Sequence, residues 1–396
     1  MAVLRYIAPA LAVAAGAAAQ SCGNGGTTTI QSNADATGLA SCRTYSGSIA
    51  IATGTTDNIQ LSNIQTITGS LTASNVTQMT SLAADSLQEI GDSFTLTSLT
   101  ILSTLNFPQL TKVDTIEWTA LPALQGLSFS TGVQDVSMLT IDNTQLNNLN
   151  GINLEVVDTM YVANNPYLTS VNMQLGNVTK ALTLAANGRD LDVQFPNLMW
   201  AYNMSIRNAS SVSIPSLASV NGSLGFYSDG FENLTAPNLT SVGGQLSFVS
   251  CNAVTNISMP ELTTIGGGFQ LANNTQLGQI DGFPALKTVG GALDFNGVFT
   301  DVSLPKLSDV RGAFNLQSTK NIDSACTHFS SLSGSNNAIK GVFTCKGSLT
   351  NPGGTGTLPS GTNSGGSSTS SGAATPVLIP GVTGFLGVVA AIFGLL

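Results

Sequence analysis

A short sequence motif recurs about every 22 residues and constrains this chain more than any other feature. Its clearest form is an apolar residue, a proline, a variable residue and a leucine, with successive prolines 19 to 24 residues apart. The six clearest copies of the motif are Phe195-Pro196-Asn197-Leu198, Ile214-Pro215-Ser216-Leu217, Ala236-Pro237-Asn238-Leu239, Met259-Pro260-Glu261-Leu262, Phe283-Pro284-Ala285-Leu286 and Leu304-Pro305-Lys306-Leu307. In the last five, an apolar-x-apolar triplet such as Leu224-Gly225-Phe226 follows. A repeat of this length predicts a solenoid, in which each turn buries its apolar side against its neighbours.

The same spacing continues towards the N-terminus without the prolines. Positions equivalent to the proline, from 62 to 305, mark twelve turns of about 22 residues. Because apolar-x-apolar is the period of a strand, alternate side chains face the interior and the solvent. Pro and Gly mark the turns between short strands. We therefore expect a mainly β chain, with a right-handed parallel β-solenoid of about twelve leucine-rich-repeat-like turns over residues 61–320.

The ends of such an array need closure, because a terminal turn lacks a neighbour on one side. Two pairs of cysteines flank the repeats, so we expect a stapled N-terminal cap over residues 20–60 and a C-terminal cap over residues 321–346. Five cysteines also allow other pairings. Cys251 is left over, and a small buried thiol is favoured there over an intermolecular bridge. The expected disulfides are Cys22–Cys42 and Cys326–Cys345.

The N-terminus has the pattern of a secretory signal peptide over residues 1–19. Arg5 precedes an apolar run, and three alanines stand before Gln20. Charged flank, apolar run and small-residue cleavage site come in the order that a signal peptide requires. Secretion would place the chain where disulfides form and persist.

The composition changes after Cys345. Residues 347–376 are rich in Gly, Ser and Thr, which predicts a flexible stalk. Residues 377–396 carry no charge and could form a transmembrane helix, but Pro380 and several glycines weaken a helix and no Lys or Arg flanks the run. Small residues, a polar spacer and an apolar tail are typical of a glycosylphosphatidylinositol (GPI) anchor signal. We expect the lipid to be attached at Asn363.

Charge and chemistry-bearing residues limit the function classes. Only 8% of residues are charged and the net charge is −9, which argues against nucleic acid as a partner. The single His328 has no second His with which it could form a metal site or a catalytic acid–base pair. Asp281, Asp294, Asp301 and Asp309 occupy different phases of the repeat, whereas glycoside hydrolysis needs two carboxylates close together. We expect no catalytic residue, metal or cofactor; a polysaccharide-active enzyme on a β-solenoid is the alternative.

Nine Asn-x-Ser/Thr sequons are candidate N-glycosylation sites in a secreted chain. They are Asn75, Asn177, Asn203, Asn208, Asn221, Asn233, Asn238, Asn256 and Asn273. An alternative role, as turn residues whose amides bond inward, applies to Asn164, Asn187, Asn208 and Asn273. Such a side chain would be unavailable to a glycan, so the favoured glycosylation sites are Asn75, Asn221, Asn238 and Asn256.

The outward residue of each triplet forms a predicted column of small polar groups on a flat parallel sheet. The simplest interpretation is a solvated sheet face. The alternative is a face that contacts glycans, because hydroxyls can bond to sugars and tyrosine rings can stack on them. The residues of this candidate glycan-contact face are Thr72, Thr95, Thr140, Tyr161, Thr183 and Tyr227.

Signal peptide, cysteine-flanked turns, Ser/Gly-rich stalk and GPI tail together resemble the fungal extracellular-mutant/sporulation-specific family of GPI-anchored cell-wall organisation proteins. The repeats are similar to the receptor L domains of growth-factor receptors. The resemblance spans essentially the whole chain. It implies a non-enzymatic surface glycoprotein that supports cell-wall organisation and integrity, on the outer leaflet of the plasma membrane and in the wall. It also implies wall polysaccharides or mannoproteins as partners, and supplies no active-site residues.

Overall fold

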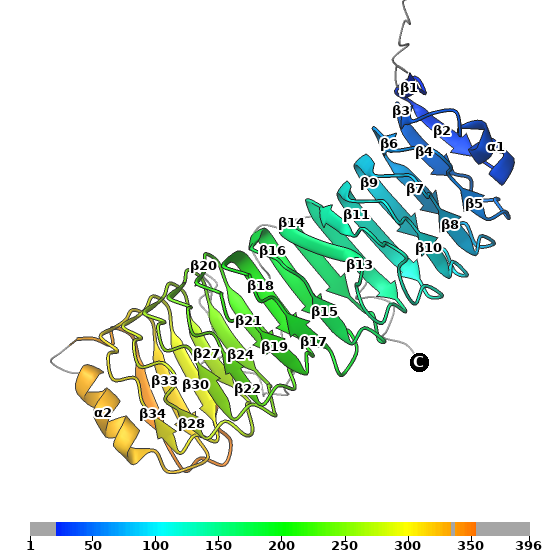
Figure 1. The fold of residues 1–396 in the computed structure, drawn as a ribbon. Helices are drawn as coiled ribbons and strands as arrows, with labels where there is room; N and C mark the ends of the chain where they lie inside the picture. The colour runs from blue at the N-terminus through cyan, green and yellow to red at the C-terminus, as the bar shows by residue number, and fades with distance from the viewer. Residues whose placement is uncertain (1–20, 334–336, 354–396) are drawn as a thin grey trace, which may run out of the picture. The chain divides into compact units, whose positions relative to one another are not determined.

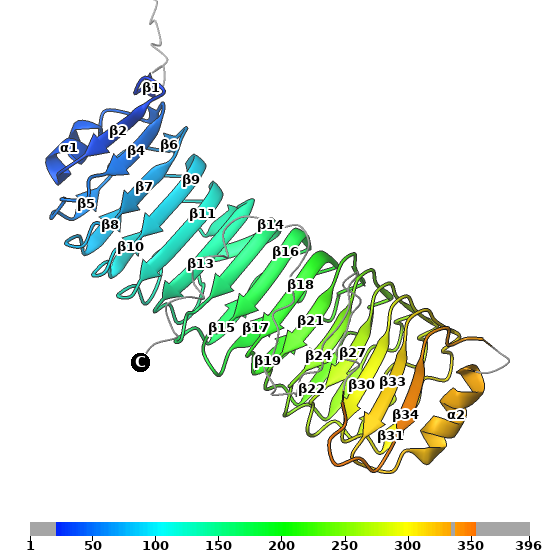
Figure 2. The same cartoon turned by 180° about the vertical axis from the view of Figure 1, so that it is seen from behind.

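The computed structural model describes residues 21–333 and 337–353. Over these residues the chain winds into a parallel β-solenoid of about thirteen turns, which confirms the expected fold class (Figures 1 and 2). A complete turn contains three short strands. The first and second strands join one 24-stranded sheet, and the third strands form four small sheets. We call the outward sides of these three sets the first, second and third faces.

The strands that are present keep this order along the array. The first strands are β1 (Ser21–Cys22), β3 (Thr44–Tyr45), β6 (Thr66–Ile67), β12 (Val133–Asp135), β20 (Ser219–Val220), β23 (Ser241–Val242), β26 (Thr264–Ile265), β29 (Thr288–Val289) and β32 (Asp309–Val310). The second strands are β2 (Thr27–Ile30), β4 (Ser48–Ile51), β7 (Leu71–Ser74), β13 (Met138–Thr144), β21 (Leu224–Tyr227), β24 (Leu246–Val249), β27 (Phe269–Ala272), β30 (Leu293–Gly297), β33 (Phe314–Ser318) and β34 (Phe343–Lys346).

Some turns in the middle of the array fuse the first and second strands into one. These long strands are β9 (Glu89–Thr97), β11 (Lys112–Leu121), β14 (Ile152–Ala163), β16 (Asn177–Ala185) and β18 (Trp200–Arg207). The third strands are β5 (Ile59–Gln60), β8 (Ser81–Ala83), β10 (Thr104–Asn106), β15 (Ser170–Asn172), β17 (Asp192–Gln194), β19 (Ser211–Ser213), β22 (Asn233–Thr235), β25 (Asn256–Ser258), β28 (Gln279–Ile280) and β31 (Asp301–Val302).

The core is a stack of identical positions from successive turns. Leu224 and Phe226 of β21 are fully buried, and the Phe226 ring stacks on Phe248 of the next turn with a centroid distance of 4.9 Å. Further along, Phe269 packs edge-on against Phe295 at 4.8 Å. Burying one such side chain contributes about 1.5–3 kcal/mol. Each turn is therefore stabilised mainly by its two neighbours.

A helix takes the place of the third strand at each end (Figure 1). Helix α1 (Asn33–Gly38) follows β2, and α2 (Asp323–Ser333) follows β33. Residues 20–60, which we expected to form only a cap, also contain β1 to β4, which pair in parallel with the following turns. The array therefore starts before residue 61, which accounts for the additional turn.

Two disulfides staple the ends in the pairing expected from the sequence. Cys22 bonds Cys42, and Cys326 of α2 bonds Cys345 of β34. Phe329 of α2 also packs on the terminal turn. Cys251 is a buried free thiol.

Paired glycines at the corner between first and second strands permit close stacking of the turns. A Cβ atom on Gly290 would lie 2.2 Å from the carbonyl oxygen of Gly266, and one on Gly266 would lie 2.2 Å from that of Gly243. Real Cβ atoms do not approach this closely. The repeated glycines therefore meet a packing requirement of the backbone.

Several predicted segments lie outside the described residues and stay predictions: the signal peptide (1–19), most of the stalk with Asn363, and the apolar tail (377–396). Within residues 21–333 and 337–353, no helix is both long and apolar enough to cross a membrane.

Candidate functional site

The outward residues of the second strands form one continuous column on the second face. Each pairs in register with the equivalent residue of the next turn, at the ~4.8 Å spacing of hydrogen-bonded strands. From the N-terminal side the column runs through Thr72, Thr95, Glu117, Thr140, Tyr161, Thr183, Ser205, Gly225, Ser247, Gln270, Asp294 and Asn315. The structure thus brings the predicted glycan-contact residues together, with Tyr227 two residues beyond Gly225 on the same strand.

The N-terminal half of this column lacks side-chain hydrogen-bond partners among residues 21–333 and 337–353. Its side chains are half-buried between neighbouring turns, except for the exposed Glu117, and none makes a side-chain hydrogen bond within the described residues. We call this set the open column: Thr72, Thr95, Glu117, Thr140, Tyr161 and Thr183. A hydroxyl can both donate and accept, so the open column offers both kinds of bond to a ligand.

Tyr161 is the aromatic member of the open column. Burial raises the pKa of its phenol, and the nearby Asp142 carboxylate adds to the shift. The Asp142 carboxylate itself is held by the Asn164 amide, at 2.8 Å. Tyr161 therefore stays a neutral hydrogen-bond donor at physiological pH.

Tyr227, the other predicted aromatic, already has partners. Its ring lies over Gly225, where an added Cβ atom would come 2.4 Å from Tyr227 Cε2. The Arg207 guanidinium lies over the same ring, 4.4 Å from its centroid. Its ring is therefore less available for stacking on a ligand than the sequence suggests.

The C-terminal half of the column is bonded within the protein. Gln245 donates to Ser247 at 2.7 Å, and Asn315 donates to Asp294 at 2.7 Å. Asn315 also donates to the carbonyl oxygen of Gly353 at 3.0 Å, so the chain beyond the last turn crosses the face here. This difference between the two halves could not be predicted from the sequence.

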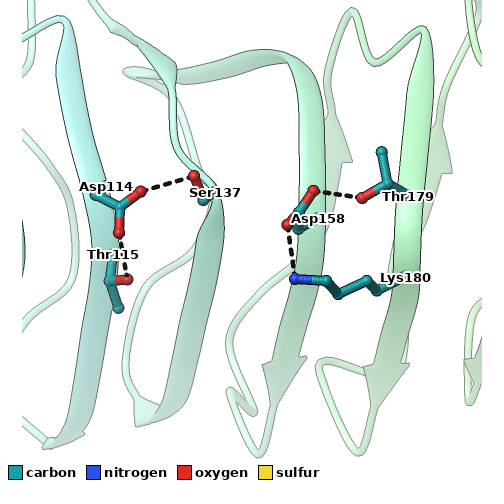
Figure 3. A network of polar contacts seen from close by, with 6 residues as sticks. All are labelled: Asp114, Thr115, Ser137, Asp158, Thr179 and Lys180. Atoms are coloured by element: carbon teal, nitrogen blue, oxygen red, sulfur yellow. Dashed lines mark hydrogen bonds and ion pairs between the residues drawn. The ribbon is translucent and has the colours of Figure 1, made fainter.

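A network of polar contacts lines the corner beside the open column (Figure 3). Asp114 accepts from Ser137 at 2.7 Å, and Asp158 accepts from Lys180 at 2.7 Å and from Thr179. The hydrogen bond from Lys180 and that from Thr179 lower the pKa of Asp158. The ion pair is exposed, so these contacts mainly orient side chains and add little stability.

The nine sequons all lie off the outward column of the second face. Asn177 is on the first face, Asn203 and Asn221 are at the corner between first and second strands, and Asn233 and Asn256 pair with each other on the third face. The other four lie in loops between strands. Asn75, Asn208 and Asn273 each have a positive φ, and the side-chain amide of Asn238 donates to the Pro215 carbonyl.

The inward-bonding asparagines were assigned one position too early in most turns. Asn208 and Asn273 are exposed residues in left-handed backbone conformation, as is Asn164, so their amides do not face inward. Only Asn187 of the four is buried with an inward bond, to the Val162 carbonyl at 2.9 Å. In the other turns the residue after the left-handed one points inward, as Asn165 and Asn274 do.

The candidate carboxylates do not gather into one site. Asp294 lies on the second strand β30, Asp301 on the third strand β31 and Asp309 on the first strand β32. Across residues 21–333 and 337–353, no group of three His, Cys, Asp or Glu side chains is placed to hold a metal ion.

Sequence reasoning missed an exposed apolar cluster on the first face. It consists of Val156 on β14, Tyr202 on β18 and Met199, the residue just before β18, with the half-buried Trp200 among them. The available signal was the residue type: the equivalent position of Trp200 in later turns is the hydroxyl residue Ser219, Ser241 or Thr264.

Comparison with known proteins finds relatives that cover most of this chain. A family model described as Ecm33, GPI-anchored cell wall organization protein, matches residues 1–40. Protein ecm33 of Aspergillus fumigatus is 43% identical over 354 residues, covering 89% of this chain and 88% of that protein. A cell surface GPI-anchored protein of Arthroderma benhamiae is 44% identical, covering 87% of this chain and 88% of its own length.

A more distant relative is cell wall mannoprotein PST1 of Saccharomyces cerevisiae, 34% identical over 77% of this chain and 68% of its own. Among solved structures, a leucine-rich repeat protein from Bacteroides ovatus covers 70% of this chain and 87% of its own at 11% identity, with a TM-score of 0.23. The high identity and near-complete coverage of the fungal relatives confirm the resemblance seen in the sequence. This chain belongs to the Ecm33 family of fungal GPI-anchored, cell-surface proteins of cell-wall organisation.

Proposed function

We propose that this protein organises the wall without catalysis, by binding an extended wall polysaccharide along the open column of the second face. The observation that carries the proposal is the contrast between the two halves of the column. From Thr72 to Thr183 the polar side chains have no partner in the described residues, whereas around Asn315 they are bonded to one another and to Gly353.

The sequon positions support the choice of this face. A protein-linked glycan would obstruct a neighbouring polymer, and none of the nine sequons lies in the outward column. Sugar hydroxyls would exchange hydrogen bonds with the threonines, while the Tyr161 ring would pack on a pyranose face.

Binding along this face would depend on repetition. One neutral hydrogen bond contributes about 0.5–1.5 kcal/mol net, so a single sugar would bind weakly. A polymer that spans several turns would gain from each one because later contacts form intramolecularly. A stalk over residues 347–376, with the lipid on Asn363, would present the solenoid to the wall.

The competing function is a wall-polysaccharide hydrolase. The exposed carboxylate in the open column that such an enzyme would use is Glu117. Incubation with β-glucan or chitin, followed by assay of new reducing ends, separates the two functions. Turnover that Glu117→Gln abolishes would establish the hydrolase and end the proposal.

The direct test is binding of a secreted form lacking residues 377–396 to insoluble β-glucan, chitin and mannan. A double variant, Thr95→Arg with Thr183→Arg, should lower retention on one of these polymers at least tenfold because long charged side chains would cover the column. Asn172→Arg, on the third strand β15, is the matched control and should bind normally. Equal retention of all three proteins, or retention of none, would contradict the proposal.

A further inference from the structure

The exposed apolar cluster on the first face is unusual for a central part of a sheet. Val156, Met199 and Tyr202 are 49%, 56% and 48% exposed, and Trp200 is half-buried. Trp200 and Tyr202 are two residues apart on β18 and both point outward. Exposed apolar side chains that gather in one place generally mark a surface that something covers.

A sequon lies in the middle of this cluster. Asn177 of Asn177-Val178-Thr179 pairs in register with Val156 on one side and with Trp200 on the other. The three side chains therefore project from adjacent strands at ~4.8 Å intervals. Asn177 is partly exposed, and its amide makes no hydrogen bond within the described residues, so its nitrogen is available for a glycan.

Other sequons have different surroundings. Asn203 accepts the Ser223 amide at 2.8 Å, and Asn238 donates to Pro215 at 2.9 Å. Asn233 and Asn256 pair with each other rather than with apolar residues. Asn177 is thus distinguished by register partners that are both large and apolar.

We propose that Asn177 carries an N-linked glycan whose first N-acetylglucosamine packs between Trp200 and Val156, so that this apolar cluster is the seat of the protein's own glycan. One face of the sugar ring presents C–H groups, which pack on an indole ring, while its polar edges stay in water. Burial of these apolar groups stabilises the folded state. The glycan also hides Met199 and Tyr202 from other molecules.

This inference needs passage through the secretory pathway but not polysaccharide binding. The seat lies on the first face, whereas the open column lies on the second. Loss of one leaves the other testable, so the two proposals can fail independently.

The first test uses the full chain expressed in a fungal host. Glycopeptide mass spectrometry should find Asn177 occupied. Under native conditions endoglycosidase H should cleave the Asn177 glycan at least fivefold more slowly than the glycan on Asn256, the control on the third face. An unmodified Asn177, or equal cleavage rates, would overturn the proposal.

The second test links the protection to the apolar partners. Trp200→Ser, which introduces the residue of the next turn, should bring cleavage at Asn177 to the rate at Asn256. Asn177→Gln should lower the melting temperature of the wild type by a few degrees and leave that of Trp200→Ser unchanged. If Trp200→Ser is not secreted, Val156→Thr serves in its place with the same expected direction. Protection that neither substitution reduces would contradict the seat.

Discussion

Asp229 accepts a hydrogen bond from the backbone amide of Ala209, one turn earlier, through its Oδ1 atom at 2.7 Å. Asn274 accepts from the Cys251 amide in the same way at 2.9 Å, and its Nδ2 donates to the Phe248 carbonyl. Asp229 is buried, and its Oδ2 has no partner among the described atoms. Asp229 therefore places a carboxyl group at the buried position that Asn274 occupies in a later turn.

The first prediction concerns this carboxyl. Burial raises the pKa of Asp229 to about 8, against the opposing effect of the Ala209 amide. Asp229→Asn supplies an amide that needs no proton, so it should stabilise the protein at pH 7 by about 1–3 kcal/mol. Chemical denaturation of the two proteins measures the difference. A less stable variant at pH 7 would show that Asp229 is charged and paired.

The pH dependence gives a separate prediction. Between the unfolded pKa near 4 and the folded pKa of about 8, the native state holds a proton that the unfolded state lacks. Stability from Asp229 is therefore complete below pH 4 and falls as pH rises to 8, by about 1 kcal/mol per pH unit. The difference in unfolding free energy between Asp229→Asn and wild type should grow over this window. A constant difference would contradict the assignment.

The glycine corners should tolerate no side chain. Gly290→Ala places a methyl group 2.2 Å from the Gly266 carbonyl oxygen, which forces two turns apart. We expect a loss of at least about 2 kcal/mol, as for other overpacked sites. Gly126→Ala is the control, because a Cβ atom there meets nothing within 4 Å. Similar melting temperatures for the two variants would show that the turns can separate at no cost.

Substitution of two neighbouring residues of β30 should destabilise the protein to very different extents. Leu293 is fully buried, so Leu293→Asp leaves an unpaired charge in the core and should cost several kcal/mol. Asp294 points outward, is only partly buried and accepts a hydrogen bond from the buried Asn315, so Asp294→Ala should cost about 1–2 kcal/mol. Thermal unfolding distinguishes them, and equal losses would mean that the inward and outward positions are assigned wrongly.

The end staples should matter more than the internal cysteine. Removing either disulfide as a double Cys→Ser variant should cost about 3 kcal/mol, because each closes a loop of 19 to 20 residues.

Burial raises the pKa of the Cys251 thiol to about 12, with the Asp229 carboxyl adding to the shift. Cys251 should therefore resist alkylation in the folded protein and react after unfolding. Rapid alkylation of the native protein would contradict its buried position.

Much of the architecture follows from the sequence because a strand has a period of two. The triplet Leu224-Gly225-Phe226 fixes which side chains enter the core, and the register then aligns Gly225 with Ser205 and Ser247. The disulfides followed from the need to close the ends. These features depend on local pattern alone.

Other features depend on conformations that the pattern does not record. A single left-handed residue at the end of most second strands shifts the inward position by one, which is why Asn273 was taken for its neighbour Asn274. The earliest turns were missed because Thr27–Ile30 and Ser48–Ile51 are not accompanied by the leucine and proline of the motif in later turns. The partners of Asn177 became visible only once the register placed Val156 and Trp200 beside it.

The central claim is that wall polysaccharide lies along the open column. Carbodiimide-driven amidation of carboxylates, read by peptide mass spectrometry with and without bound polymer, tests it at single residues. Glu117 on the second face is exposed, and Asp301 on the third face is the exposed control. Bound polysaccharide should reduce labelling of Glu117 severalfold and leave Asp301 unchanged. Unchanged labelling of Glu117, or protection of Asp301 instead, would place the polymer elsewhere and contradict the account.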